Sequence, residues 1–120
     1  MTPLFSFREA RNMACILLCL LPGAAAAASF SCRSVTAPDE KAVCSDRELS
    51  EKDVRMATTY GMLRQLVLMG GRGALQAEQT AWLQKRQECG DNTLCLSHVY
   101  DDRIETLNRQ YRYIVASLNR

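Results

Sequence analysis

The chain has 120 residues, enough for one domain, and carries 15 lysines and arginines against 13 aspartates and glutamates. A formal net charge of +2 argues against a general nucleic-acid-binding protein, which needs a strong basic excess to displace counterions from phosphates. It also argues against attachment to an anionic membrane through a polybasic segment.

Residues 1–28 have the three parts of a secretory signal peptide. Arg8 and Arg11 form a basic start, residues 13–21 are apolar, and an alanine run ends at Ala28. These alanines are the small residues that a signal peptidase requires. We therefore predict cleavage after Ala28.

A membrane anchor is the alternative interpretation, because the uncharged residues 12–32 approach the roughly 20 residues that span a bilayer. Pro22-Gly23 interrupts this stretch, and its alanine half is only weakly hydrophobic, so a cleaved signal is favoured. Cys19 follows Leu18, and Cys15 follows Asn12-Met13-Ala14, so neither has a small residue before it within the apolar context of a lipoprotein signal. The sequence predicts a mature domain of residues 29–120 in the periplasm or outside the cell, with no stable membrane insertion.

Four of the six cysteines remain in this mature chain. An even number in a small exported domain predicts two disulfides. Three pairings are open, and proximity in the sequence favours Cys32 with Cys44 and Cys89 with Cys95. A zinc site is the alternative for these thiols, although intervals of eleven and five residues fit zinc motifs poorly.

The start of the mature domain contains two helix signals. Pro38 begins a short segment that extends to Cys44, since proline suits a first helical turn and acidic residues follow it here. Ser45 and Glu48 have the spacing of a capping box, which predicts the start of a long helix running to about Met69. Its apolar residues recur at intervals of three and four, as in Met56, Tyr60, Leu63 and Val67.

Two more helices are expected after a glycine-rich turn at residues 70–73. The second helix spans about Ala74 to Glu88, and the third begins at a cap, Asp91 or Asn92, and runs to about Ser117. No segment alternates apolar and polar residues as a strand does. The predicted fold is all-α: a small antiparallel bundle of three main helices plus a short N-terminal helix, stapled by two disulfides.

The sequence offers no catalytic, metal or cofactor site that we would assign. His98 is the single histidine and has no HExxH partner, and the glycine-rich turn lacks the Lys-Ser/Thr ending of a phosphate-binding loop. Asp101, Asp102 and Glu105 lie beside Arg103, as is typical of a solvated helix face. We therefore predict a protein that is not an enzyme.

Polar residues interrupt the apolar faces in a regular way. Asp53 lies at the start of the first long helix, Gln79 and Arg86 share a face with Trp82, and Arg103 adjoins the apolar stripe of the last helix. Trp82 and Arg86 are four residues apart, so the guanidinium can lie over the indole. We interpret these residues as contacts that hold one helix against another.

Taken in order, the motifs form one pattern from Ser31 to about Leu107. Its pieces are Ser31-Cys32, the run from Asp39 to Asp46, Glu48-Leu49-Ser50, Asp53, Tyr60, the run from Glu78 to Arg86, Cys89-Gly90, Cys95-Leu96, Tyr100, Arg103-Ile104 and Leu107. This pattern resembles the N-terminal domain of the lysozyme-inhibitor LprI-type family. The resemblance implies an exported helical protein with a structural polar and aromatic motif at Glu40, Asp53, Tyr60, Gln79, Trp82, Arg86, Tyr100 and Arg103.

The resemblance also implies a function, namely inhibition of lysozyme (muramidase) by occupying its cleft. Lysozymes use two carboxylates there, and Arg72 between glycines is our candidate to contact them; the favoured alternative is that residues 70–73 are an ordinary flexible linker. The alternative is a helical interaction or accessory module of the cell envelope with another partner. Near-neutral charge and the late Tyr111 and Tyr113 are compatible with that alternative, because tyrosines are enriched at protein contacts.

Overall fold

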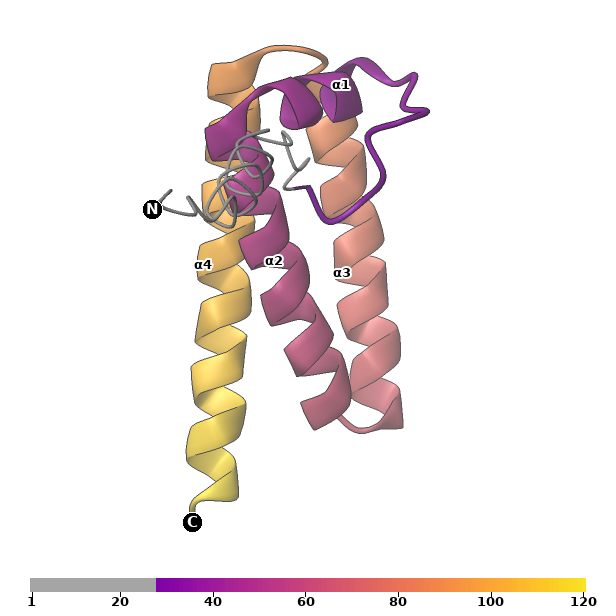
Figure 1. Cartoon of the computed structure of the whole chain (residues 1–120). Helices are drawn as coiled ribbons and strands as arrows, with labels where there is room; N and C mark the ends of the chain where they lie inside the picture. The colour runs from indigo at the N-terminus through magenta and orange to yellow at the C-terminus, as the bar shows by residue number, and fades with distance from the viewer. Residues whose placement is uncertain (1–27) are drawn as a thin grey trace, which may run out of the picture.

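The computed structural model describes residues 28–120, which form four helices. They are α1 (Pro38–Ser45), α2 (Arg47–Leu66), α3 (Met69–Glu88) and α4 (Thr93–Leu118). The three long helices run antiparallel in succession, and α1 lies across one end of them (Figure 1). Within the described residues there is no strand, which confirms the predicted helical bundle. The predicted signal peptide falls almost entirely on residues 1–27, outside the described part.

Within residues 28–120, no helix combines the length and the apolar character needed to cross a bilayer.

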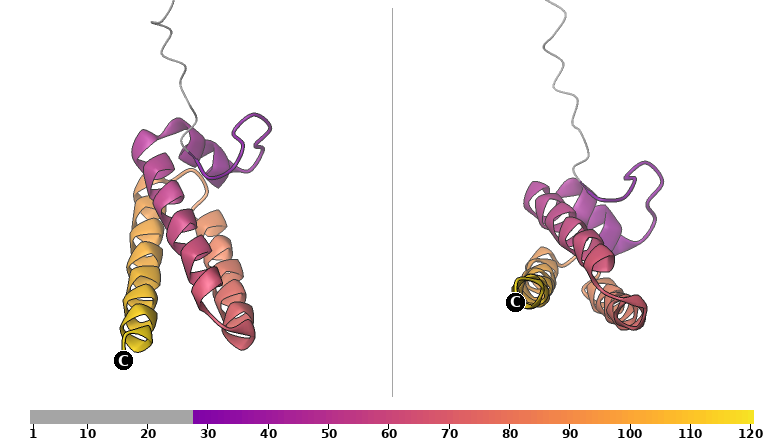
Figure 2. Two further views of the ribbon diagram at one scale, coloured as in Figure 1. Left: turned by 60° about the horizontal axis from the view of Figure 1, so that its bottom comes forward. Right: turned by 90° about the horizontal axis from the view of Figure 1, so that it is seen from below.

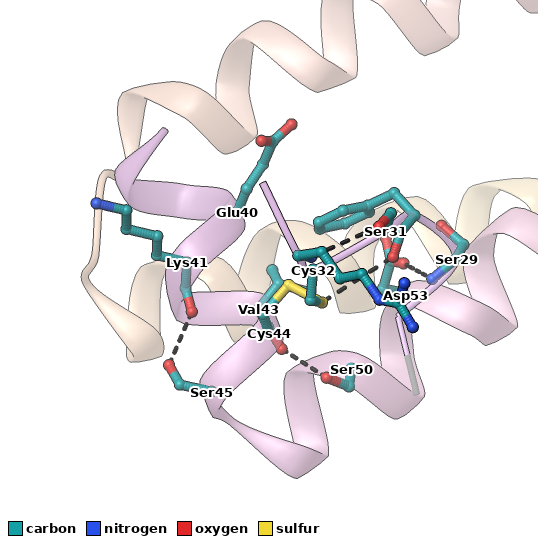
Figure 3. Close-up of a disulfide and its surroundings, with 12 residues drawn as sticks. Ser29, Ser31, Cys32, Glu40, Lys41, Val43, Cys44, Ser45, Ser50 and Asp53 are labelled. Carbon is teal, nitrogen blue, oxygen red and sulfur yellow. Dashed lines mark hydrogen bonds between the residues drawn. A yellow bond between two sulfur atoms is a disulfide. The ribbon is translucent and has the colours of Figure 1, made fainter. Parts of the chain in front are cut away.

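Both disulfides lie at the end of the bundle that α1 covers, which we call the closed end. Cys32–Cys44 joins the N-terminal arm to the last turn of α1 (Figure 3), and Cys89–Cys95 joins the end of α3 to the first turn of α4. The favoured pairing is confirmed, and the zinc alternative is wrong because all four thiols are bonded in pairs. Closing these short loops in the unfolded chain stabilises the fold by roughly 2–3 kcal/mol each.

The start of α2 differs by one residue from the prediction. Asp46, not Ser45, is the N-cap, and its carboxylate accepts a hydrogen bond from the Leu49 amide at 3.0 Å. Ser45 belongs to the last turn of α1, where its hydroxyl donates to a carbonyl of that helix. The cap of α4 is Asn92, one of the two residues expected, and it accepts from the Cys95 amide at 3.0 Å.

The glycine-rich segment is a helix and not the expected turn. Only Val67 and Leu68 connect α2 to α3, so Gly70, Gly71 and Gly73 lie in the first turns of α3. Gly71 approaches the connection so closely that a Cβ there would lie 3.1 Å from Val67 Cβ. A short connection between two packed helices therefore overrides the weak helix propensity of glycine.

The predicted apolar stripes meet in one core, and α2 packs most extensively against α4. Its buried members come from all four helices: Ala42, Val43, Leu49, Met56, Leu63, Leu75, Trp82, Leu96, Tyr100, Ile104 and Leu107. Toward the end away from α1, which we call the open end, α4 diverges from α2 and α3, which are joined there by their short connection (Figure 2). At the open end the three long helices therefore leave a groove between them that core side chains do not fill.

Candidate functional site

The closed end contains a buried polar network centred on Arg86. Its Nε donates to Asp39 Oδ2 at 2.8 Å, joining α3 to α1, and the side chain is only 5% exposed. Its Nη1 lies 3.4 Å from the Tyr100 hydroxyl, which donates to Asp53 Oδ1 at 2.8 Å. Charges buried this deeply require such partners, because their loss of hydration is costly. Sequence analysis had missed Asp39 as the main partner of Arg86, since 47 residues separate them.

Aromatic rings enclose the same guanidinium. Its carbon lies 5.8 Å from the Trp82 ring centroid, as the four-residue spacing suggested, and 5.5 Å from that of Phe30 in the N-terminal arm. Trp82 packs edge-on against Tyr100 at 5.1 Å, and its indole N–H donates to the Val99 carbonyl at 3.0 Å. The network is thus shielded from solvent and ties all four helices together.

The electrostatics of the network keep Tyr100 in its neutral form. Burial raises the pKa of the Tyr100 phenol far above its usual value, and the neighbouring Asp53 carboxylate adds to the rise. The hydroxyl is therefore a permanent donor to Asp53 at neutral pH.

A second polar cluster joins α3 to α2 and α4 nearer the middle of the bundle. Arg103 Nε donates to Gln79 Oε1 at 3.0 Å, and its Nη1 lies 3.4 Å from Glu78 Oε2. Gln79 in turn donates to the Met56 sulfur at 3.2 Å, and Gln110 donates to Glu78 at 3.0 Å. These bonds explain why polar side chains interrupt the apolar faces of α3 and α4.

The two remaining motif residues lie at the edges of these clusters. Glu40 is half-buried, 3.7 Å from Arg86 Nη2. Tyr60 is also half-buried, with the Arg64 guanidinium 5.9 Å from its ring centroid. The polar atoms of the motif are directed mainly at one another, an arrangement suited to holding helices together.

The open end carries a groove of about 280 Å³ between α2, α3 and α4. Its lining is mostly apolar: Leu63, Val67, Gly71, Ala74, Leu75, Glu78, Gln110, Tyr113 and Ile114. The Gln110 carbonyl oxygen has no hydrogen-bond donor within residues 28–120. Concave apolar surfaces with a few polar groups are typical of binding sites.

Large exposed apolar side chains lie at the same end of the molecule as this groove. Leu68 is 86% exposed and Met69 82% exposed at the corner where α2 turns into α3, and Tyr113 is 78% exposed on α4. Clustered exposure of this kind marks contact surfaces. Sequence analysis had placed Leu68 and Met69 in the long helix, so it gave no sign of their exposure.

The open end is also basic. No acidic residue occurs between Asp53 and Glu78, whereas Arg64 and Arg72 lie in that interval and line one shallow depression at the α2–α3 corner. From residue 105 to the last residue, three arginines, Arg109, Arg112 and Arg120, accompany one acidic residue, Glu105. Arg72 is exposed as predicted, but it lies on a helix.

Comparison with known proteins adds a distant relationship. No protein-family model matches the chain, and no solved structure matches it. Curated proteins that match include the lipoprotein LprI of Mycobacterium tuberculosis and of Mycobacterium bovis, each 29% identical over 82 residues. The chain is a distant relative of LprI. The match covers 66% of this chain but only 40% of the length of each LprI protein.

Proposed function

We propose that the chain is an exported cell-envelope protein that inhibits lysozyme by binding to it, without catalysis of its own. The observation that carries this proposal is the relationship to LprI over 82 residues, in a chain whose motif order resembles the LprI-type inhibitor domain. The two disulfides support it, since disulfides persist in oxidising compartments outside the cytoplasm. In this proposal residues 1–28 direct export, and residues 29–120 act in the periplasm or after secretion.

The open end is the proposed contact surface. Lysozyme acts through two carboxylates, so a protein that fills its cleft needs a convex segment carrying a cation. The α2–α3 connection is such a corner (Figure 1), with Leu68 and Met69 exposed at its tip and Arg72 in the next turn. An arginine can bind a carboxylate through two parallel hydrogen bonds.

The helical position of Arg72 favours this role. Its amide donates to the Leu68 carbonyl at 3.0 Å, and its Nε donates to the Val67 carbonyl at 3.3 Å. The backbone and the side chain are thus already ordered before a partner arrives, which lowers the entropy lost on binding. A flexible glycine turn would lack this advantage.

A muramidase assay tests the proposal. The oxidised, processed protein is titrated into lysozymes of different classes that act on a cell-wall suspension. We expect dose-dependent inhibition that is lost when the disulfides are reduced. Absence of inhibition at high molar excess of protein that is folded by circular dichroism would disprove the proposed function.

Two arginine variants test the contact surface within the same assay. We expect Arg72→Ala to raise the half-inhibiting concentration at least about tenfold, since losing one charge-assisted bond costs about 1.5 kcal/mol or more. Arg47→Ala is the matched control, because that side chain is 91% exposed at the closed end of the molecule. Equal inhibition by both variants would show that the α2–α3 corner is not part of the interface with lysozyme.

The apolar groove favours a second candidate function, an accessory module that binds a partner helix from another envelope protein. Ala74 lines the groove and is exposed, so Ala74→Arg would obstruct it without disturbing the core. Under this alternative, periplasmic pull-down recovers a partner other than lysozyme, and Ala74→Arg abolishes its recovery. If Ala74→Arg leaves recovery of the partner unchanged, the groove is not its binding site.

A further inference from the structure

Asp53 is a buried carboxylate whose charge is incompletely balanced. It is 1% exposed, and one of its oxygens accepts the Tyr100 hydroxyl. Among the described residues, the cation that reaches it is Arg86, whose Nη1 is 4.0 Å from Oδ1. Arg86 forms its closer ion pair with Asp39 and lies 3.7 Å from Glu40 as well. One guanidinium therefore serves three carboxylates, which leaves this cluster with an excess of negative charge.

The other oxygen of Asp53 faces the backbone of the N-terminal arm. The Ser29 nitrogen lies 2.6 Å from Asp53 Oδ2 (Figure 3), and 24 residues separate the two along the chain. Ser29 is also the residue that follows the predicted signal-peptide cleavage site. Cleavage would therefore act directly on the atom that contacts the buried carboxylate.

We infer that Asp53 is the binding site for the α-ammonium group that signal-peptide removal creates at Ser29. Hydrolysis breaks the bond between the Ala28 carbonyl carbon and the Ser29 nitrogen. Water supplies a hydroxyl to the carbonyl and a proton to the nitrogen, which takes a further proton from solvent at neutral pH. A neutral amide donor becomes a cation with three donors at the same position.

The new charge completes the network. The two buried carboxylates, Asp39 and Asp53, then face two cations, the Arg86 guanidinium and the α-ammonium group of Ser29, while the third carboxylate, Glu40, is partly exposed to solvent. A charge-assisted bond is shorter and stronger than that of a neutral amide, and its acceptor here, Asp53, is buried. The domain thus reaches full stability only after processing, which links its folding to export. This inference depends on the cleavage site and not on lysozyme inhibition.

The test starts from the whole chain, exported in a bacterial host and recovered from the periplasm. Mass spectrometry identifies the N-terminal residue of the processed protein. A second form carries one glycine inserted between Ala28 and Ser29, so that the processed chain begins one residue earlier and the Ser29 nitrogen stays an amide. Both forms are also made with Asp53→Asn. Asp46→Asn is the control background, because it makes the same chemical change at the half-buried N-cap of α2, away from the Ser29 nitrogen.

In the two backgrounds that keep Asp53, the otherwise unmutated protein and Asp46→Asn, we expect the inserted glycine to lower the melting temperature by about 5–10 °C. This decrease corresponds to the loss of one charge-assisted bond. With Asp53→Asn the insertion should have little effect. A processed chain that starts at another residue would overturn the inference, as would an equal effect of the insertion in all three backgrounds.

A second measurement avoids Asp53→Asn altogether, in case that variant does not fold. The α-amine of the processed wild-type protein is acylated at neutral pH in the native and in the denatured state. We expect acylation to be slower in the native state by about tenfold or more, the factor that one charge-assisted bond corresponds to. Equal rates would show that the amine is not held by Asp53.

Discussion

Replacing Tyr100 with phenylalanine removes a single hydroxyl from the centre of the buried network and leaves the ring in the core. The hydroxyl donates to Asp53 at 2.8 Å, a short bond to a carboxylate, and its loss costs about 1.5–3 kcal/mol. The contact with Arg86 Nη1 at 3.4 Å is long and adds little. We expect the free energy of unfolding to fall by about 2 kcal/mol and the melting temperature by roughly 8–16 °C.

Urea and thermal unfolding followed by circular dichroism measure this change. Tyr113→Phe is the matched control, since that side chain is exposed on α4 and its change should stay within about 0.5 kcal/mol. The cost of Tyr100→Phe should also shrink when Asp53→Asn is present, because both variants remove the same bond. A loss for Tyr100→Phe no larger than that of the control would refute the reasoning that this bond stabilises the fold.

Three further predictions follow from the same structure. Because burial raises the pKa of Tyr100, the phenol loses its proton at a lower pH in the unfolded chain than in the folded protein. The free energy of unfolding should therefore fall above pH ~10, by up to about 1.4 kcal/mol per pH unit. Urea titrations at several pH values should show a weaker slope for Tyr100→Phe. Gly73→Ala should stabilise the protein by about 0.5–1 kcal/mol, because Gly73 is helical with open space around it. Gly90→Ala should destabilise it by about 1 kcal/mol in thermal unfolding, because Gly90 has a φ of +55°. The opposite order of stabilities would support the turn predicted at residues 70–73. Replacing Cys89 and Cys95 together by alanine should cost about 2–3 kcal/mol in urea unfolding, and an unchanged midpoint would mean that the closed end holds without this link.

Much of the fold could be predicted because its signals are local. The spacing of Met56, Leu63, Tyr100 and Leu107 identifies the buried helix faces without reference to any other part of the chain. The cap at Asn92 is local as well, since a side chain meets the amide three residues on. The disulfide pairing could be predicted because each partner lies close in sequence to the other.

The errors occurred where local preference competes with packing. Ser45 and Asp46 are both good N-caps, and only the length of α1 assigns Ser45 to the preceding helix. The glycines before Leu75 favour a turn in isolation. Burial of Leu75 and the two-residue connection from α2 extend the helix through them.

The sequence by itself determined the helices, the two covalent links and the residue types of the polar motif, because each depends on neighbours a few positions away. Only the tertiary structure decided what those polar residues meet: Arg86 reaches Asp39, and the Ser29 nitrogen reaches Asp53. It also decided that α4 diverges from α2 and α3 at the basic open end, where all three helices line an apolar groove. Partners from distant parts of the chain become neighbours only when the core packs, and periodicity within one helix contains no information about them.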